Sequence, residues 1–203
     1  MISVITGDII NSKSADPVQW LEPLKDELNK YGPSPKVWEI YRGDSFQLII
    51  KDPGDAFLAA VKIKAAIKTR KNLDVRLAIG IGEEKYDAET ITESNGSAFV
   101  YSGEKLETLK KEKLNLAIKS DRDSFDEELN LNIKLGLIAM DNWTPNSAEA
   151  VKLALENQNL PQKELGQMLG LKQNTVSYRL KRAYFDEIMA INERYRMKLG
   201  ELL

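Results

Sequence analysis

The sequence predicts a mixed α/β (α+β) domain over residues 1–141, followed by an all-α domain over residues 142–203. Short β-branched runs alternate with helical patterns up to about Asp141, whereas nothing after Trp143 resembles a strand. The chain has 203 residues, of which 42% are hydrophobic, so it can form two small domains with buried cores. Charge is divided unevenly, because residues 161–182 hold five basic and one acidic side chain, a local charge of +4. Since the net charge is −2, the remainder carries −6, and the basic segment is a local electrostatic footprint.

The N-terminal domain is expected to follow the order strand, helix, β-hairpin, helix, strand, helix. Asp16 and Pro17 are a typical helix start, and a glycine-containing turn at residues 42–44 separates the two hairpin strands. This order is that of a ferredoxin-like domain with an extra helix, and the alternative is another small α+β sandwich. Residues 113–141 are expected to add one or two last strands and a helix. The strands are placed at residues 2–6, 37–41, 45–50 and 73–81, and the helices at 16–31, 56–71 and 94–113.

A helix-turn-helix is predicted in the segment LPQKELGQMLGLKQNTVSYRLKR, residues 160–182. Gly170 stands where the chain must turn sharply, since glycine accepts a positive φ. In DNA-binding proteins of this kind the N-terminal part of the second helix enters the major groove. Amide side chains can pair with adenine, and basic side chains can contact guanine or phosphate. The expected DNA-binding residues are Lys172, Gln173, Asn174, Thr175, Ser177, Tyr178, Arg179 and Lys181.

This segment resembles the helix-turn-helix of bacterial regulators and of promoter-reading domains of sigma factors, which implies double-stranded DNA as a partner. The alternative is an ordinary helical hairpin whose polar face is solvated. Residues 183–203 continue as an amphipathic helix with an apolar stripe that includes Ile188, Tyr195 and Leu199. Such a stripe favours a homodimer, and the alternative is that it packs on its own domain.

Composition excludes several kinds of chemistry. The chain contains no cysteine and no histidine, so disulfides, thiol nucleophiles and the commonest general base are excluded. Neither an apolar run of about 18 residues nor a signal peptide is recognisable, and we therefore expect a cytoplasmic protein with no membrane partner. Trp38 and Trp143 are expected to be packing residues.

Asp8 follows the first predicted strand and Asp44 lies in the hairpin. If those strands are neighbours, the two carboxylates converge and can hold magnesium against the phosphates of a nucleotide. The alternative is simple turn chemistry, since Gly-Asp is common in turns. Arg42 is interpreted either as an ion-pair partner of Asp44 or as a phosphate contact, and Arg76 as part of a solvated strand face.

The motifs TGDII, YRGDSF, VRLAIGIG and GSAFVYSGEKL occur in the order found in class III nucleotidyl cyclases. This resemblance covers roughly the first 110 residues and implies Asp8, the carbonyl of Ile9 and Asp44 as metal ligands. It also suggests Arg42 and Lys105 as nucleotide contacts. Cyclases carry an Asn and an Arg in the helix that corresponds to residues 99–106, whereas Tyr101 and Lys105 stand near those positions here. Cyclase activity is therefore not expected.

As a whole the chain resembles the SatD family. The resemblance rests on MISVITGDIINS, YRGDSFQ, AIGIG, NGSAF with YSGEKL, and NWT before the predicted helix-turn-helix, and it runs from Met1 to about Arg182. It implies a two-part architecture and leaves the biochemistry open. We expect a DNA-binding transcriptional regulator whose α/β domain senses a nucleotide or another small ligand. The alternative is a magnesium-dependent nucleotide-binding or nucleotidyl-transfer enzyme fused to a DNA-binding module.

Overall fold

The computed structural model describes residues 1–202 and contains one five-stranded sheet in the order β2-β3-β1-β4-β5. The central strand β1 (Ile2–Ile10) pairs antiparallel with β3 (Ser45–Ile50) and with β4 (Asp74–Gly82). The edge strands are β2 (Trp38–Tyr41), antiparallel to β3, and β5 (Leu116–Lys119), parallel to β4. The first four strands with their helices have the ferredoxin-like order, to which β5 is added. The predicted mixed α/β fold class is therefore confirmed.

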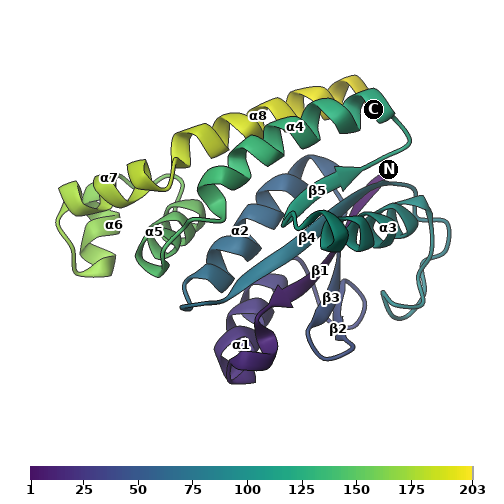
Figure 1. The fold of residues 1–203 in the computed structure, drawn as a ribbon, viewed down its shortest axis with the longest axis horizontal. Helices are drawn as coiled ribbons and strands as arrows, with labels where there is room; N and C mark the ends of the chain where they lie inside the picture. The colour runs from purple at the N-terminus through teal and green to yellow at the C-terminus, as the bar shows by residue number, and fades with distance from the viewer. Residues whose placement is uncertain (203) are drawn as a thin grey trace.

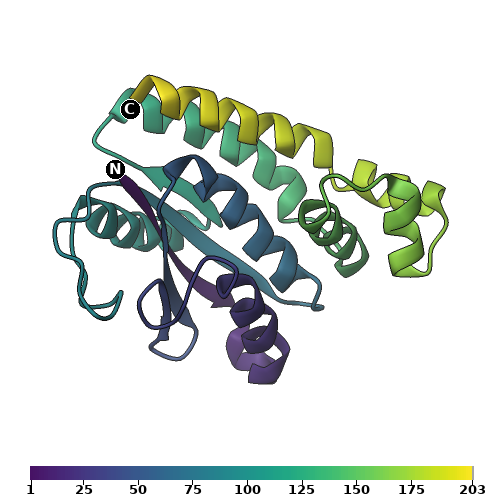
Figure 2. The ribbon, with the colours of Figure 1, turned by 180° about the vertical axis from the view of Figure 1, so that it is seen from behind.

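Helices cover both faces of the sheet (Figures 1 and 2). On one face lie α1 (Pro17–Leu28) and α2 (Ala56–Lys68), and on the other lies α3 (Ser97–Glu112). The approach of α3 is close, because a Cβ at Gly80 would lie 2.1 Å from the carbonyl oxygen of Ala98. Asp8 lies two residues from Thr6, whose hydroxyl bonds Ser102 of α3, so Asp8 shares the α3 face of the sheet.

Several predicted boundaries differ from the structure. Strand β1 continues to Ile10 instead of ending at Thr6, so Asp8 lies inside the strand. Asp16 caps α1 as predicted, since its carboxylate accepts from the Val18 amide at 3.1 Å. Residues 113–141 were expected to add one or two strands and a helix, and they form one strand, β5, and one helix, α4 (Asp123–Met140), to which residues 134–138 belong. Their apolar side chains recur at helical spacing over eighteen residues, and this periodicity outweighs their local β-like composition. Short 3₁₀ helices occupy Ser12–Ser14 and Pro53–Asp55.

The C-terminal part is all helical, as predicted. Helices α5 (Pro145–Glu156), α6 (Gln162–Leu169) and α7 (Gln173–Arg182) gather at one end of the molecule, beyond the sheet (Figures 1 and 2). Helix α8 (Phe185–Leu202) then returns alongside α4. The apolar stripe of α8 is buried within its own chain, where the Tyr195 hydroxyl donates to the Pro53 carbonyl at 2.7 Å. The terminal helix thus packs on its own chain, and the boundary near Asp141 stays a prediction.

One ion network connects the sheet to the end of α4, and one hydrogen bond connects segments of the C-terminal helices. The ammonium group of Lys64, on α2, is fully buried and forms ion pairs with Asp74 at 2.6 Å and with Asp141 at 2.7 Å. The Trp143 indole, itself buried, donates to the Ala183 carbonyl at 2.9 Å and joins the two ends of the α5–α7 cluster. Trp38 is buried as well, so both tryptophans are packing residues as predicted. Among the described residues, no helix is long and apolar enough to cross a membrane.

Candidate nucleic-acid interface

The turn between α6 and α7 is sharp because of two glycines. Gly170 ends α6 in the left-handed conformation, with φ of 65°, and the Leu171 amide donates back to the Gly166 carbonyl at 2.8 Å. A Cβ at Gly166 would lie 2.7 Å from the carbonyl oxygen of Leu171, so this position also needs glycine. The sequence prediction identified the role of Gly170 and missed that of Gly166. The sequence feature that could have indicated this role is the position of Gly166 on the inner side of α6.

The inner faces of α6 and α7 pack against α5. Leu165, Val176 and Leu180 are buried and belong to the same hydrophobic cluster as the core around the sheet. The Thr144 hydroxyl caps α5 by accepting from the Ser147 amide at 3.2 Å, and Pro145 occupies the first turn of this helix. The apolar side of α7 therefore faces inward, and its orientation is set by buried contacts.

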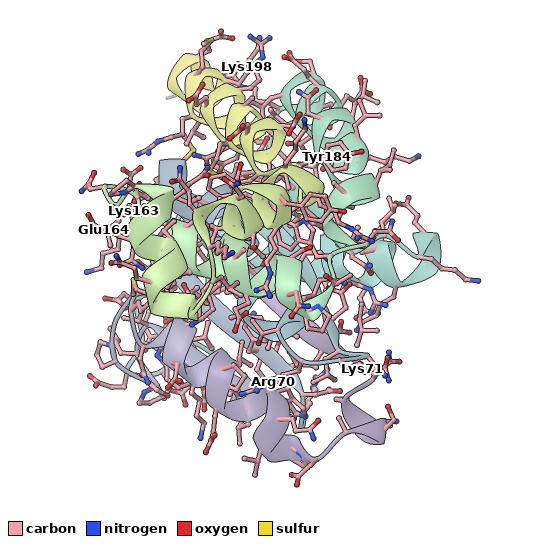
Figure 3. All side chains as sticks on the ribbon, turned by 90° about the vertical axis from the view of Figure 1, so that its left-hand side faces the viewer. Arg70, Lys71, Lys163, Glu164, Tyr184 and Lys198 are labelled. Atoms are coloured by element: carbon pink, nitrogen blue, oxygen red, sulfur yellow. The ribbon has the colours of Figure 1, made fainter. Side chains whose placement is uncertain are left out.

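The opposite side of α7 projects into solvent, and Tyr178 is 63% exposed. Figure 3 views the molecule from this end, and Lys163 and Glu164 of α6 project from its edge. We call the following exposed residues the outer face of α7: Lys172, Gln173, Asn174, Thr175, Ser177, Tyr178 and Lys181. The structure thus brings all but one of the residues predicted from the sequence onto one accessible surface.

Arg179 differs from its neighbours. Its side chain is 17% exposed, and its guanidinium pairs with Glu149 of α5 at 3.0 Å and so braces α7 against α5. Within the described part of the chain, Lys172 and Lys181 form no ion pair, and no side chain caps the start of α7. Amide N–H groups at an uncapped helix start, together with the helix dipole, favour an anion at that position. The outer face of α7 therefore has unneutralised positive charge next to exposed amide side chains.

At the predicted metal site, unlike on the outer face of α7, the charged side chain of Asp8 is already paired within the chain. The Asp8 carboxylate accepts two hydrogen bonds from the Arg76 guanidinium, at 3.0 and 3.1 Å, and lies 3.7 Å from the Lys110 ammonium. The hydrogen bond to Glu107 raises the pKa of Lys110, desolvation lowers it, and the negative charge of Asp8 raises it further, for a net increase. Arg76 is 19% exposed, so the expectation of a solvated strand face was wrong. Asp8 and Arg76 lie opposite one another in the register of β1 and β4, which only the structure shows.

The other residues predicted for the N-terminal site make contacts of different kinds. The Ile9 amide donates to the Asp44 carbonyl at 3.2 Å, so the two segments are neighbours as expected. The Asp44 carboxylate accepts from the Ser12 hydroxyl, whereas Arg42 has a positive φ of 51° in the hairpin turn. Lys105 lies on α3 beside a surface hollow that Asp126 also lines, away from the Asp8–Arg76 pair. Among the described residues, no hydrogen bond or ion pair joins Arg42 to Lys105.

Whether these residues suit a magnesium ion depends on their present partners. Arg76 and Lys110 supply beside Asp8 the positive charge that a metal ion would otherwise supply. Among the described residues, no group of three acidic side chains gathers at one point. This geometry gives no support to magnesium at Asp8, Ile9 and Asp44, which stays a prediction.

No curated protein and no solved structure matches the chain. A model of the SatD family matches residues 1–197, a span that includes both the Asp8–Arg76 pair and α7. The chain therefore belongs to the SatD family.

Proposed function

We propose that the chain is a transcriptional regulator that binds double-stranded DNA through α6 and α7, acting as a helix-turn-helix. The observation that carries the proposal is the outer face of α7, where amides and lysines without ion-pair partners project from a helix whose other side is buried. A solvated helical hairpin needs polar side chains on this face, but it needs neither the excess of positive charge nor the clustering of amides. Both features suit a surface that meets phosphates and base edges.

Each side chain of the outer face has a distinct task in this proposal. Gln173 and Asn174 stand in the first turn of α7, the part that reaches base edges in the major groove, and each can bond adenine through two hydrogen bonds. Lys172 and Lys181 lie at opposite ends of α7, where the two walls of the groove carry phosphates. The uncapped amides at the start of α7 add a further phosphate contact.

The α/β domain is proposed to sense a nucleotide or another small ligand and to transmit its state to α7. The supporting contact is the buried Lys64 ammonium, which joins α2 and β4 to Asp141 at the end of α4, four residues before the start of α5. A shift of α2 would change this ion network. The loss of one partner from a buried ion pair lowers the stability of the fold, because it leaves a buried charge without compensation. The α5–α7 cluster would then move with α2.

The test is fluorescence anisotropy with duplex fragments of the genome that encodes the chain, measured over a range of salt concentrations. Removing both Lys172 and Lys181 with K172A and K181A is expected to lower the slope of log affinity against log salt by about 2, since each phosphate contact contributes about 1. The matched control removes Lys85 and Lys111, which are exposed, lie outside α5–α7 and change the net charge equally.

Two results would contradict the proposal. The first is no binding of the unmodified chain to any duplex fragment at low salt. The second is an equal loss of affinity and slope in the K85A/K111A control, which would show that only overall charge matters.

A further inference from the structure

Helix α4 exposes apolar side chains along the side opposite its core contacts. We call this surface the α4 patch: Leu131, Leu135 and Ile138 of α4 with Tyr184 at the junction of α7 and α8. Between 54% and 69% of each residue is exposed. The α4 members recur at intervals of four and three, which aligns them along one side of the helix. Figure 3 shows Tyr184 on the side of the molecule where α4 lies.

The α4 patch continues into a groove between α4 and α8. The groove has a volume of about 490 Å³, and its walls include Ile188 and Ile191 of α8 together with Leu135 and Ile138. The two helices approach closely at Gly136, where a Cβ would lie 2.8 Å from the Ile191 side chain. Together the patch and groove form a continuous apolar surface, of a kind that soluble monomers rarely leave exposed.

The charges beside the α4 patch are self-complementary. Lys134 is exposed on α4, next to the patch, and Glu187 lines the α8 side of the groove. Neither side chain forms an ion pair within residues 1–202. A two-fold axis parallel to the helices places the Lys134 edge of one copy against the Glu187 edge of the other. Opposite charges on opposite edges therefore favour an identical partner.

The exposed apolar area of the α4 patch is as large as the apolar centre of a dimer interface requires. Each patch residue exposes roughly 100 Å², so two copies contribute about 800 Å² of apolar surface. A stable interface buries about 1,600 Å² in total, somewhat more than half of it apolar. The surrounding polar residues of α4 and α8 would supply the rest.

We propose that the α4 patch binds the same patch of a second copy of this chain, about a two-fold axis parallel to α4 and α8. This arrangement places both α7 helices at the same end of the dimer, where they can reach two half-sites of one DNA duplex. That consequence rests on the proposed function, whereas the association itself does not. The dimer forms through α4 and not through the stripe of α8, which is buried in its own chain.

Sedimentation velocity without DNA tests the association. The unmodified chain is expected to be a dimer at micromolar concentrations, and Leu135→Glu to raise the dimer dissociation constant about 30-fold or more. Because Leu135 is 58% exposed, circular dichroism should show an unchanged helix content for this variant. The control is Val18→Glu, which places the same charge at a residue on α1 that is 55% exposed, and it should leave the dimer intact.

Single cysteines test the direction of the axis, and the natural chain contains no cysteine to interfere. A disulfide requires the two Cα atoms to lie within about 7 Å. With the axis parallel to α4, both Leu131→Cys and Ile138→Cys should cross-link to their own counterparts under mild oxidation. With antiparallel α4 helices, at most one of the two can do so, because they lie about 10 Å apart along the helix.

The outcomes separate this inference from the proposed function. A chain that remains monomeric at high concentration, or a dimer that Leu135→Glu leaves intact, overturns the α4 interface even if DNA binding is observed. A dimer that cross-links as expected but binds no DNA keeps the interface and overturns the proposed function. Cross-linking at only one of the two positions overturns the parallel axis.

Discussion

The Asp8 edge of the sheet and the outer face of α7 both carry clustered charges, yet only one of them leaves those charges unpaired. Asp8 is bonded by Arg76 and approached by Lys110, so charge on this edge is neutralised within the chain. Lys172 and Lys181 have no ion-pair partner among residues 1–202, and the amides beside them are exposed.

The contrast between the two regions indicates where a ligand can bind at a low free-energy cost. A charge that already has a protein partner must lose it before it can bind a metal ion or phosphate, whereas a solvated lysine loses mainly water and counterions. The two regions therefore predict opposite mutational behaviour. Substitutions at Asp8 should affect stability, and substitutions on the outer face of α7 should affect DNA binding.

The largest expected effect is on sequence-specific binding. Replacing Gln173 and Asn174 together with alanine should cost about 2–6 kcal/mol on a preferred duplex, since each two-bond adenine contact contributes about 1–3 kcal/mol. Competition binding with preferred and unrelated duplexes measures this loss, which should be small for the unrelated duplex. An equal loss on both duplexes would contradict base reading by these amides.

The next effect is on stability at the Asp8 edge. Asp8→Asn should lower the free energy of unfolding by about 1–3 kcal/mol, because it leaves the mostly buried Arg76 guanidinium without its carboxylate. Urea unfolding measures the change, and Asp121→Asn, at an exposed position without an ion pair, is the matched control.

The same variant tests the magnesium prediction. Melting curves with nucleotide and magnesium should shift equally, or not at all, for the natural chain and for Asp8→Asn. A magnesium-dependent shift that Asp8→Asn abolishes would contradict our view of a structural ion pair and support the nucleotide-binding alternative.

The smallest effect is expected at Arg179. Because its guanidinium pairs with Glu149, Arg179→Ala should leave the salt slope of DNA binding nearly unchanged and cost about 0–1 kcal/mol of stability. Lys181→Ala, two residues further along α7, is the comparison and should lower the slope by about 1. Equal slopes for the two variants would show that the Glu149 pair does not hold Arg179 away from DNA.

Much of this architecture could be predicted from local sequence signals. The cap at Asp16, the hairpin turn before Ser45 and the turn at Gly170 are encoded by residues next to one another in the chain. The exposed side of α7 was predictable for the same reason, since helical periodicity assigns each side chain to a face.

Contacts between distant residues were not predictable in this way. The Asp8–Arg76 pair depends on the register between β1 and β4, which no local pattern determines. The burial of the α8 stripe likewise depends on the path of the chain after Ala183, where the Trp143 indole donates to the backbone. The helical state of residues 134–138 could have been inferred from the longer periodicity of α4.

Amide chemical-shift mapping by NMR, with a short duplex at low salt, is the most direct test of the proposed contact between α7 and DNA. We expect the perturbed amides to cluster between Lys172 and Arg182, while those around Asp8 and Arg76 stay unchanged. Perturbations that avoid α7, or that centre on the Asp8 edge, would contradict this contact.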